Sequence, residues 1–231
     1  MVRPSTKRAH YLSIGVLVLL WAQSAHLSLT DQDFVRGIAS SVSRLALYAG
    51  GHGLVVALVL FGLLRLSRES LGDIGFTSQH IGKQLGIGTL FGMALFLVHN
   101  LFISPVIDAL VPASADQGVD LTLLFNNAKE YPIWILLAVL QGGLVEEGSR
   151  VFGITRFEKV FGKPGFVFAV IVGSMVFGLA HLYQGVDSAI ATAIQAVLFI
   201  LIYLRRRRTL EAVTAHAVYD IIGITIAYQI Y

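Results

Sequence analysis

Apolar residues gather in long runs along the chain, and short polar segments separate these runs. A helix needs about 20 mostly apolar residues to cross about 30 Å of hydrocarbon. Seven stretches have approximately this length, so we expect an all-α, polytopic membrane helix bundle with about seven transmembrane helices. The expected spans are 11–30, 44–65, 84–104, 131–149, 165–185, 188–204 and 210–230.

Two longer segments between the expected spans have patterns of their own. Segment 105–130 contains Pro105, Pro112 and several polar residues, which indicates an extracytoplasmic loop with a short helix. Segment 150–163 mixes aromatic and aliphatic residues with Arg, Glu and Lys, a pattern typical of an amphipathic helix on the cytoplasmic interface. The first span follows Lys7 and Arg8 but exceeds a usual signal-peptide core, so we expect a retained membrane helix. No repeat is evident, and residues 1–231 are predicted to form a single integral membrane domain.

The charged residues predict the orientation of the bundle. Basic residues fall between spans on one side of a seven-span topology, whereas aspartates fall on the other side. The positive-inside rule then places the N-terminus in the cytoplasm and the C-terminus outside. The basic set is Lys7, Arg8, Arg65, Arg68, Lys83, Arg150, Arg156, Lys159, Lys163 and Arg205 to Arg208, and the acidic set is Asp31, Asp33, Asp108, Asp116, Asp120 and Asp187.

Composition supports a membrane protein and excludes several kinds of site. Hydrophobic residues make up 55% of the chain and charged residues 13%, whereas soluble domains carry about 25% charged residues. The chain has no cysteine, which excludes disulfides, thiolate catalysis and Cys-ligated metals. The run from Arg205 to Arg208 directly follows an apolar span, so it indicates an interfacial anchor and not a nucleic-acid-binding patch.

Polar residues inside three late spans are the candidates for chemistry. Glu146 and Glu147 end the fourth span, and a carboxylate in a bilayer core costs about 2.5–3.5 kcal/mol on insertion scales. Residues four apart share a helix face. Glu146 therefore shares a face with Arg150, Phe177 with His181 on the fifth span, and His216 with Asp220 on the seventh.

These side chains are suited to hydrolysis, with or without a metal. A desolvated glutamate near a histidine can hold a water molecule and accept its proton, and histidine can stabilise an oxyanion or ligate a metal. Glu146, His181, His216 and Asp220 could hold zinc with an open water position, or act without metal. Taken singly, a Glu–Arg pair is often an interfacial ion pair and a membrane histidine is often a packing residue. Three such clusters together favour a functional site, in an enzyme or in a transporter.

The three clusters resemble the motifs of the CPBP intramembrane proteases, which include the type II CAAX prenyl proteases and bacteriocin-processing and immunity proteins. The motifs stand as Glu146-Glu147-Gly-Ser-Arg150, Phe177-Gly-Leu-Ala-His181 and His216-Ala-Val-Tyr-Asp220, within a core over 131–225. Leu71-Gly-Asp-Ile-Gly-Phe76 is similar to a segment found upstream in this family. Two departures stand out: two residues, instead of three, separate the glutamates from Arg150, and Asp220 replaces the commoner Asn.

The resemblance implies a role for each residue. Glu146 would activate the hydrolytic water with help from His181, while His216 and Asp220 would stabilise the oxyanion or hold the water. Glu147, Arg150 and Phe177 would have supporting roles. Members of the family are described both as metalloproteases and as metal-independent glutamate proteases, so zinc is left open and no other cofactor is expected.

The predicted function is therefore intramembrane endopeptidase activity on a membrane-associated protein or peptide near the cytoplasmic face of a prokaryotic plasma membrane. The expected partners are this polypeptide and the lipid bilayer, with no nucleic acid. A proton-coupled transporter that uses Glu146, His181 and His216 as a relay is one alternative. A family member that has lost catalysis and acts as a scaffold or immunity protein is another, because the spacing to Arg150 is altered.

Overall fold

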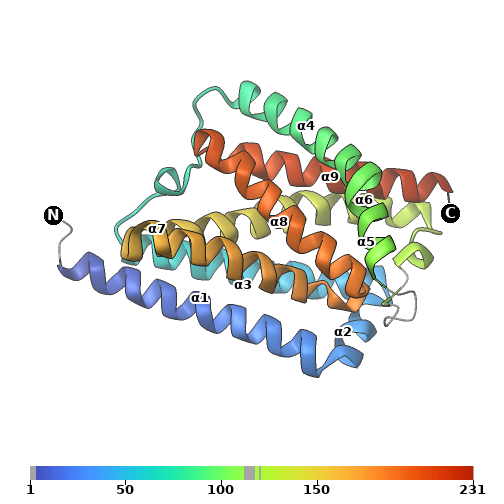
Figure 1. The fold of residues 1–231 in the computed structure, drawn as a ribbon, viewed down its shortest axis with the longest axis horizontal. Helices are drawn as coiled ribbons and strands as arrows, with labels where there is room; N and C mark the ends of the chain where they lie inside the picture. Colours follow the sequence, from blue (N-terminus) through green and yellow to red (C-terminus); the bar gives the residue numbers. More distant parts are fainter. Residues whose placement is uncertain (1–3, 112–117, 120, 231) are drawn as a thin grey trace.

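The computed structural model describes residues 4–111, 118–119 and 121–230, and in these ranges it contains helices and turns but no strand (Figure 1). Pro112, Asp116 and Asp120, which entered the predictions of the loop and the orientation, lie outside the described residues. The elements are α1 (Pro4–Thr30), α2 (Gln32–Ala39), α3 (Val42–Leu66), η1 (Leu71–Ile74), α4 (Ile81–Val98), η2 (His99–Ile103), α5 (Ser104–Leu110), η3 (Leu121–Leu124), η4 (Ala128–Glu130), α6 (Tyr131–Leu137), η5 (Ala138–Glu146), α7 (Glu147–Ala180), η6 (Leu182–Gln184), α8 (Val186–Arg206) and α9 (Thr209–Ile230). Of these, η2 and η5 are π-helices, and the other η elements are 3-10 turns.

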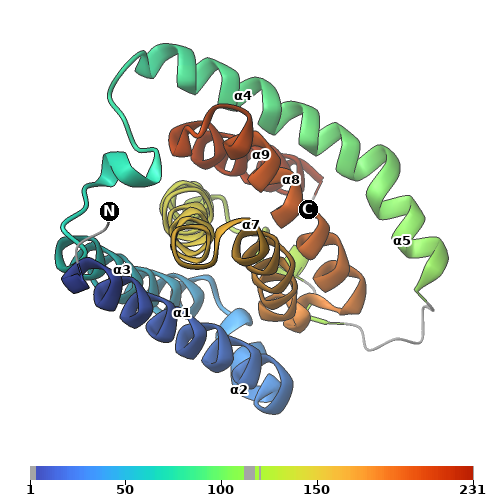
Figure 2. The same ribbon diagram turned by 60° about the vertical axis from the view of Figure 1, so that its left-hand side comes forward.

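Six helical segments of the described chain are long and apolar enough to cross a membrane. One of them, Ala128–Ala180, has 53 residues, which at 1.5 Å per residue is more than twice the length that one crossing needs. The backbone reverses within it, because Gly162 has φ 65° and ψ −147° and Pro164 follows. The two limbs of α7 lie beside each other in both ribbon views (Figures 1 and 2). The described residues therefore form seven passes, and the predicted all-α polytopic fold is confirmed.

The amphipathic helix expected on the interface over 150–163 is not a separate element. The first limb of α7 continues through this segment, and its residues from Val151 to Phe157 are buried. Arg156 is fully buried and pairs with Glu69 at the end of α3. Thr155 and Arg156 therefore lie inside the bundle, where α7 packs against α1 and other helices, whereas the side chains of Glu158, Lys159 and Lys163 stay exposed.

Two interruptions shape the helices that surround the cavity. The third pass extends to Leu110 instead of ending near 104, and it continues past Pro105. A proline lacks the N–H and crowds the carbonyl four residues before it, and the π-helical stretch η2 directly precedes this site. The second π-helix, η5, ends at Glu146. Wider π-turns of this kind frequently occur at functional sites.

The segment from Leu71 to Phe76 fastens the start of α9. Asp73 and Ser70 form a capping box at η1, and Gly75 then takes φ 87°, which favours glycine. The Gly75 carbonyl accepts a hydrogen bond from the Thr209 backbone N–H at 3.1 Å. Any side chain at position 75 would meet the Arg207 carbonyl. This contact holds the turn between α8 and α9, and thereby the register of the helix that carries His216.

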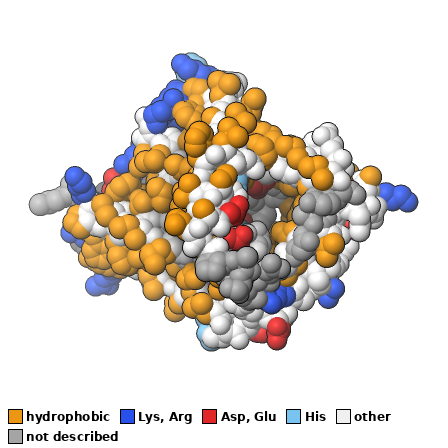
Figure 3. Space-filling model, turned by 45° about the vertical axis from the view of Figure 1, so that its right-hand side comes forward, with side chains coloured by type: hydrophobic (Ala, Val, Ile, Leu, Met, Phe, Trp, Pro, Cys, Tyr) orange, Lys and Arg blue, Asp and Glu red, His pale blue; other side chains and the backbone are white. Residues whose placement is uncertain are grey.

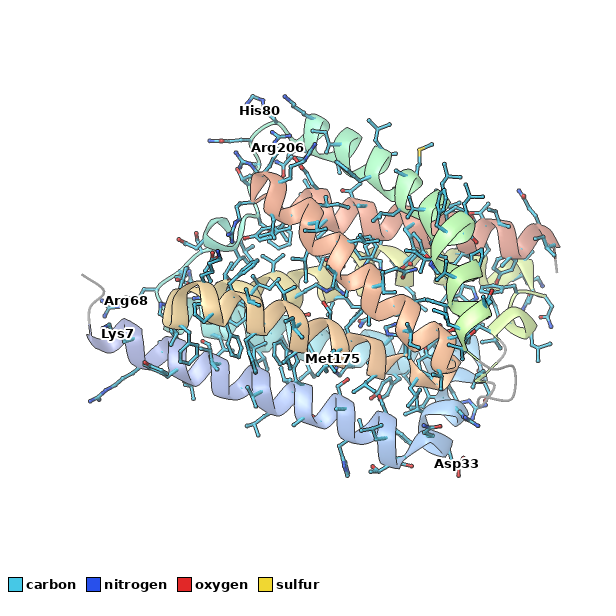
Figure 4. All side chains as sticks on the ribbon, viewed as in Figure 1. Lys7, Asp33, Arg68, His80, Met175 and Arg206 are labelled. Carbon is cyan, nitrogen blue, oxygen red and sulfur yellow. The ribbon has the colours of Figure 1, made fainter. Side chains whose placement is uncertain are left out.

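Basic side chains gather at one end of the bundle. Figure 4 shows Lys7, Arg68 and Arg206 toward one end and Asp33 at the other. Arg150 and Arg156, which were counted as loop charges, instead lie inside the bundle with side chains 6% and 0% exposed. The orientation of the bundle in a membrane stays a prediction.

Candidate active site

A cavity of about 500 Å³ lies between the helices of the bundle. It opens at the end where α5 and the start of α8 lie, and Figure 3 shows acidic side chains around the hollow. Asp108 and Asp187 are exposed lining residues near this mouth. Residues from all three sequence motifs line the same cavity, namely Glu146, Phe177, His181, His216 and Asp220.

Glycines in η5 allow α9 to approach the motif glutamates. A Cβ at Gly142 would collide with the Asp220 carboxylate and would lie 3.4 Å from His216 Nε2. At Gly143 a Cβ would lie 2.9 Å from the Val213 carbonyl oxygen. Small residues let helix backbones pack closely. The Gly142-Gly143 pair therefore sets the distance between the Glu146 helix and the His216 helix, and no role for it was predicted from the sequence.

The two adjacent glutamates have different surroundings. The Glu146 side chain lines the cavity and is 19% exposed, whereas the Glu147 side chain is 1% exposed. Glu147 accepts a hydrogen bond from His216 Nδ1 at 2.7 Å and also pairs with the Arg150 guanidinium. Successive residues of a helix are about 100° apart, so only one of the two faces the cavity.

Arg150 reaches Glu147 because it follows it by three residues, which places both on one helix face. Its guanidinium lies 4.2 Å from the centre of the Phe177 ring, a cation–π distance. The short spacing in the first motif is therefore compatible with a Glu–Arg pair. Phe177 contacts both this cation and the His181 ring, with 4.8 Å between the ring centres.

His216 is held on three sides. Its Nδ1 donates to Glu147, which as a carboxylate only accepts. Its ring stacks on Phe199 with 4.4 Å between the ring centres. Its Nε2 lies 3.9 Å from Glu146 Oε2 and 3.6 Å from Asp220 Oδ2. Glu147 therefore orients the imidazole, and Nε2 is directed toward the two cavity carboxylates.

His181 stands at the end of the second limb of α7, where the chain turns into η6. Its Nδ1 donates to the Phe177 carbonyl oxygen at 2.8 Å, so in the neutral ring Nε2 carries the lone pair. No hydrogen bond to His181 Nε2 is present among the described residues. This nitrogen is therefore available to a water molecule or a ligand in the cavity.

Glu146, His181, His216 and Asp220, the four residues proposed for zinc, line the same cavity. Within the described residues, no three His, Asp or Glu side chains converge closely enough to hold a metal ion. A role for zinc stays a prediction.

A second polar group in the cavity wall was not predicted from the sequence as a unit. Gln195 Nε2 lies 2.8 Å from His99 Nδ1 and donates to Tyr219 Oη at 2.5 Å. The three residues come from α8, η2 and α9, and all line the cavity. In the sequence, only the position of Tyr219 beside Asp220 could have linked this group to the site.

Comparison with known proteins gives one match. Residues 128–222 match the family model described as type II CAAX prenyl endopeptidase Rce1-like. The match covers all three motifs and confirms the resemblance inferred from them. No curated protein and no solved structure matches the chain.

Proposed function

We propose that the chain is an intramembrane endopeptidase, because residues 128–222 match the family model of Rce1-like type II CAAX prenyl endopeptidases. It hydrolyses a peptide bond of a membrane-associated polypeptide, and Glu146 is the general base. The observation that supports this proposal is that Glu146 and His181 line one cavity. Next to Glu146, the buried Glu147 pairs with Arg150 and accepts the hydrogen bond from His216 Nδ1.

The first step uses the unlike positions of the two glutamates. Glu146 accepts a proton from a water molecule, and His181 Nε2 accepts a hydrogen bond from the same water. The water oxygen then attacks the carbonyl carbon of the substrate and forms the new C–O bond. The negative charge moves to the former carbonyl oxygen, where His216 in its imidazolium form can donate a hydrogen bond from Nε2.

The second step returns the proton. Glu146, now protonated, gives its proton to the amide nitrogen, the C–N bond breaks, and a carboxylic acid and an amine are released. Asp220 lies 3.6 Å from His216 Nε2 and positions this ring from the cavity side. Glu147 touches no reacting atom in this scheme, and it acts by fixing His216 and Arg150.

The mouth of the cavity bears on how a substrate enters. A cytoplasmic-face substrate was expected, but the cavity opens at the end opposite the one that carries Lys7, Arg68 and Arg206. With basic residues on the cytoplasmic side, as the positive-inside rule favours, this mouth faces the extracytoplasmic side. We therefore propose entry from that side.

A cleavage screen tests the proposal. The purified chain in proteoliposomes is incubated with a library of apolar peptides, and new termini are identified by mass spectrometry. Cleavage products should appear with the unchanged chain and with Glu158→Gln, a matched control outside the cavity, and be lost with Glu146→Gln and His181→Phe. Products of equal yield from all four proteins would refute the mechanism. Peptide-independent proton flux that requires Glu146 would instead support the transporter.

A further inference from the structure

The polar group formed by His99, Gln195 and Tyr219 lies on the cavity wall and has no part in the proposed bond cleavage. Each residue comes from a different helical pass: His99 from the π-helix η2, Gln195 from α8, and Tyr219 from α9. Tyr219 directly precedes Asp220, so the group reaches the wall of the candidate active site.

Donor and acceptor counts show what this group leaves unused. The Gln195 amide NH₂ has two donors, one directed at His99 Nδ1 and one at Tyr219 Oη. His99 then carries its proton on Nε2. The Tyr219 hydroxyl proton, the His99 Nε2 proton and the Gln195 Oε1 acceptor have no hydrogen-bond partner among the described residues, and neither His99 Nε2 nor Gln195 Oε1 is fully buried.

Two donors and an acceptor on one wall match the needs of an extended peptide. A strand-like peptide carries one N–H and one C=O per residue, and each is costly to leave unpaired away from water. In a membrane-embedded cavity, side chains must satisfy these groups where water does not. The aromatic contacts of Tyr219 with Phe96 and Phe199 keep its hydroxyl on this wall.

We propose that His99, Gln195 and Tyr219 position the substrate by hydrogen bonding to its peptide backbone beside the scissile bond. This inference rests on the proposed peptidase function and extends it. The three are positioning residues and not catalytic residues. Recognition through backbone groups makes the enzyme tolerant of side-chain sequence next to the cleaved bond.

The experiment measures binding without cleavage. Glu146→Gln protein in nanodiscs is titrated with a fluorescent, 12-residue alanine–leucine peptide, and with copies in which one backbone amide at a time is an ester. An ester removes one N–H donor and weakens one C=O acceptor. At one or two positions the ester should weaken binding roughly 2- to 12-fold, the range of a single net hydrogen bond.

The variants Tyr219→Phe and Gln195→Leu, added to Glu146→Gln, should bind the all-amide peptide more weakly by a similar factor. They should also lose the sensitivity to the ester at those positions, which a merely structural role would not change. Thr192→Val, a cavity-lining change on the same helix, is the matched control and should keep the full ester pattern. An unchanged ester pattern in Tyr219→Phe and Gln195→Leu would overturn the proposal, as would absence of peptide binding. Peptide binding with this pattern, but no cleavage by the unchanged chain, would refute the peptidase function alone.

Discussion

The same isosteric change should destabilise the protein strongly at Glu147 and only slightly at Glu146. Glu147 is 1% exposed and pairs with Arg150, whose side chain is 6% exposed. Glu147→Gln leaves Arg150 as a buried cation without its carboxylate, and breaking a buried pair costs about 3–5 kcal/mol. Glu146 is 19% exposed, and its His216 contact is 3.9 Å long, so Glu146→Gln should change stability by less than about 1 kcal/mol.

The assay is SDS-induced unfolding of the purified protein in mixed micelles, followed by tryptophan fluorescence. Trp134 lies in the cavity wall and is 7% exposed, so its emission reports on this region. We expect Glu147→Gln to lower the unfolding midpoint strongly and Glu146→Gln to leave it near that of the unchanged chain. The double change Glu147→Gln with Arg150→Met should recover much of the loss, because no unpaired charge remains. A larger loss for Glu146→Gln than for Glu147→Gln would show that the two roles are reversed.

Three further predictions follow from other contacts. Gly142→Ala should reduce cleavage at least about 10-fold, because the added Cβ meets Asp220 and overpacking costs about 1–3 kcal/mol. Gly86→Ala is the control and should leave the cleavage rate unchanged, because the space around its Cβ is open. Equal cleavage rates for both variants would contradict the close approach of η5 and α9. Burial raises the pKa of the Glu69 carboxyl, but hydrogen bonds from Arg156 and Lys159 outweigh it and hold the pKa below its ordinary value of 4.5. The free energy of unfolding should therefore fall as the pH drops through the acidic range, where the unfolded chain takes up this proton first; Glu69→Gln should flatten this dependence in unfolding titrations, and an unaltered slope would disprove it. Cleavage should persist in EDTA, since the proposed mechanism activates the water with the Glu146 carboxylate and needs no metal; loss in EDTA with recovery on added zinc would establish a metal mechanism.

The sequence predicted the membrane passes well because hydropathy over about 20 residues reflects the cost of the bilayer. It also identified the residues that the structure brings to one cavity, since Glu146, His181 and His216 are costly polar groups in apolar helices. The roles assigned to them stay predictions.

Features that depend on a single backbone angle or on packing between distant helices were not predictable in this way. The reversal at Gly162 depends on one positive φ angle, and composition does not encode it. Arg156 looked like an interfacial charge because its partner Glu69 is 87 residues earlier in the chain. The grouping of His99, Gln195 and Tyr219 likewise needed the helix packing, because each residue alone has an ordinary structural explanation.

The most direct test of the central claim is the single-turnover cleavage rate of one identified peptide by Glu146→Gln protein in proteoliposomes. General-base catalysis contributes about 10²–10⁴-fold, so the rate should fall by at least about 100-fold while the unfolding midpoint is retained. Glu158→Gln, the same change at a glutamate that pairs with Arg207 outside the cavity, should cleave at the rate of the unchanged chain. Cleavage by Glu146→Gln at the unchanged rate would contradict the assignment of Glu146 as the base.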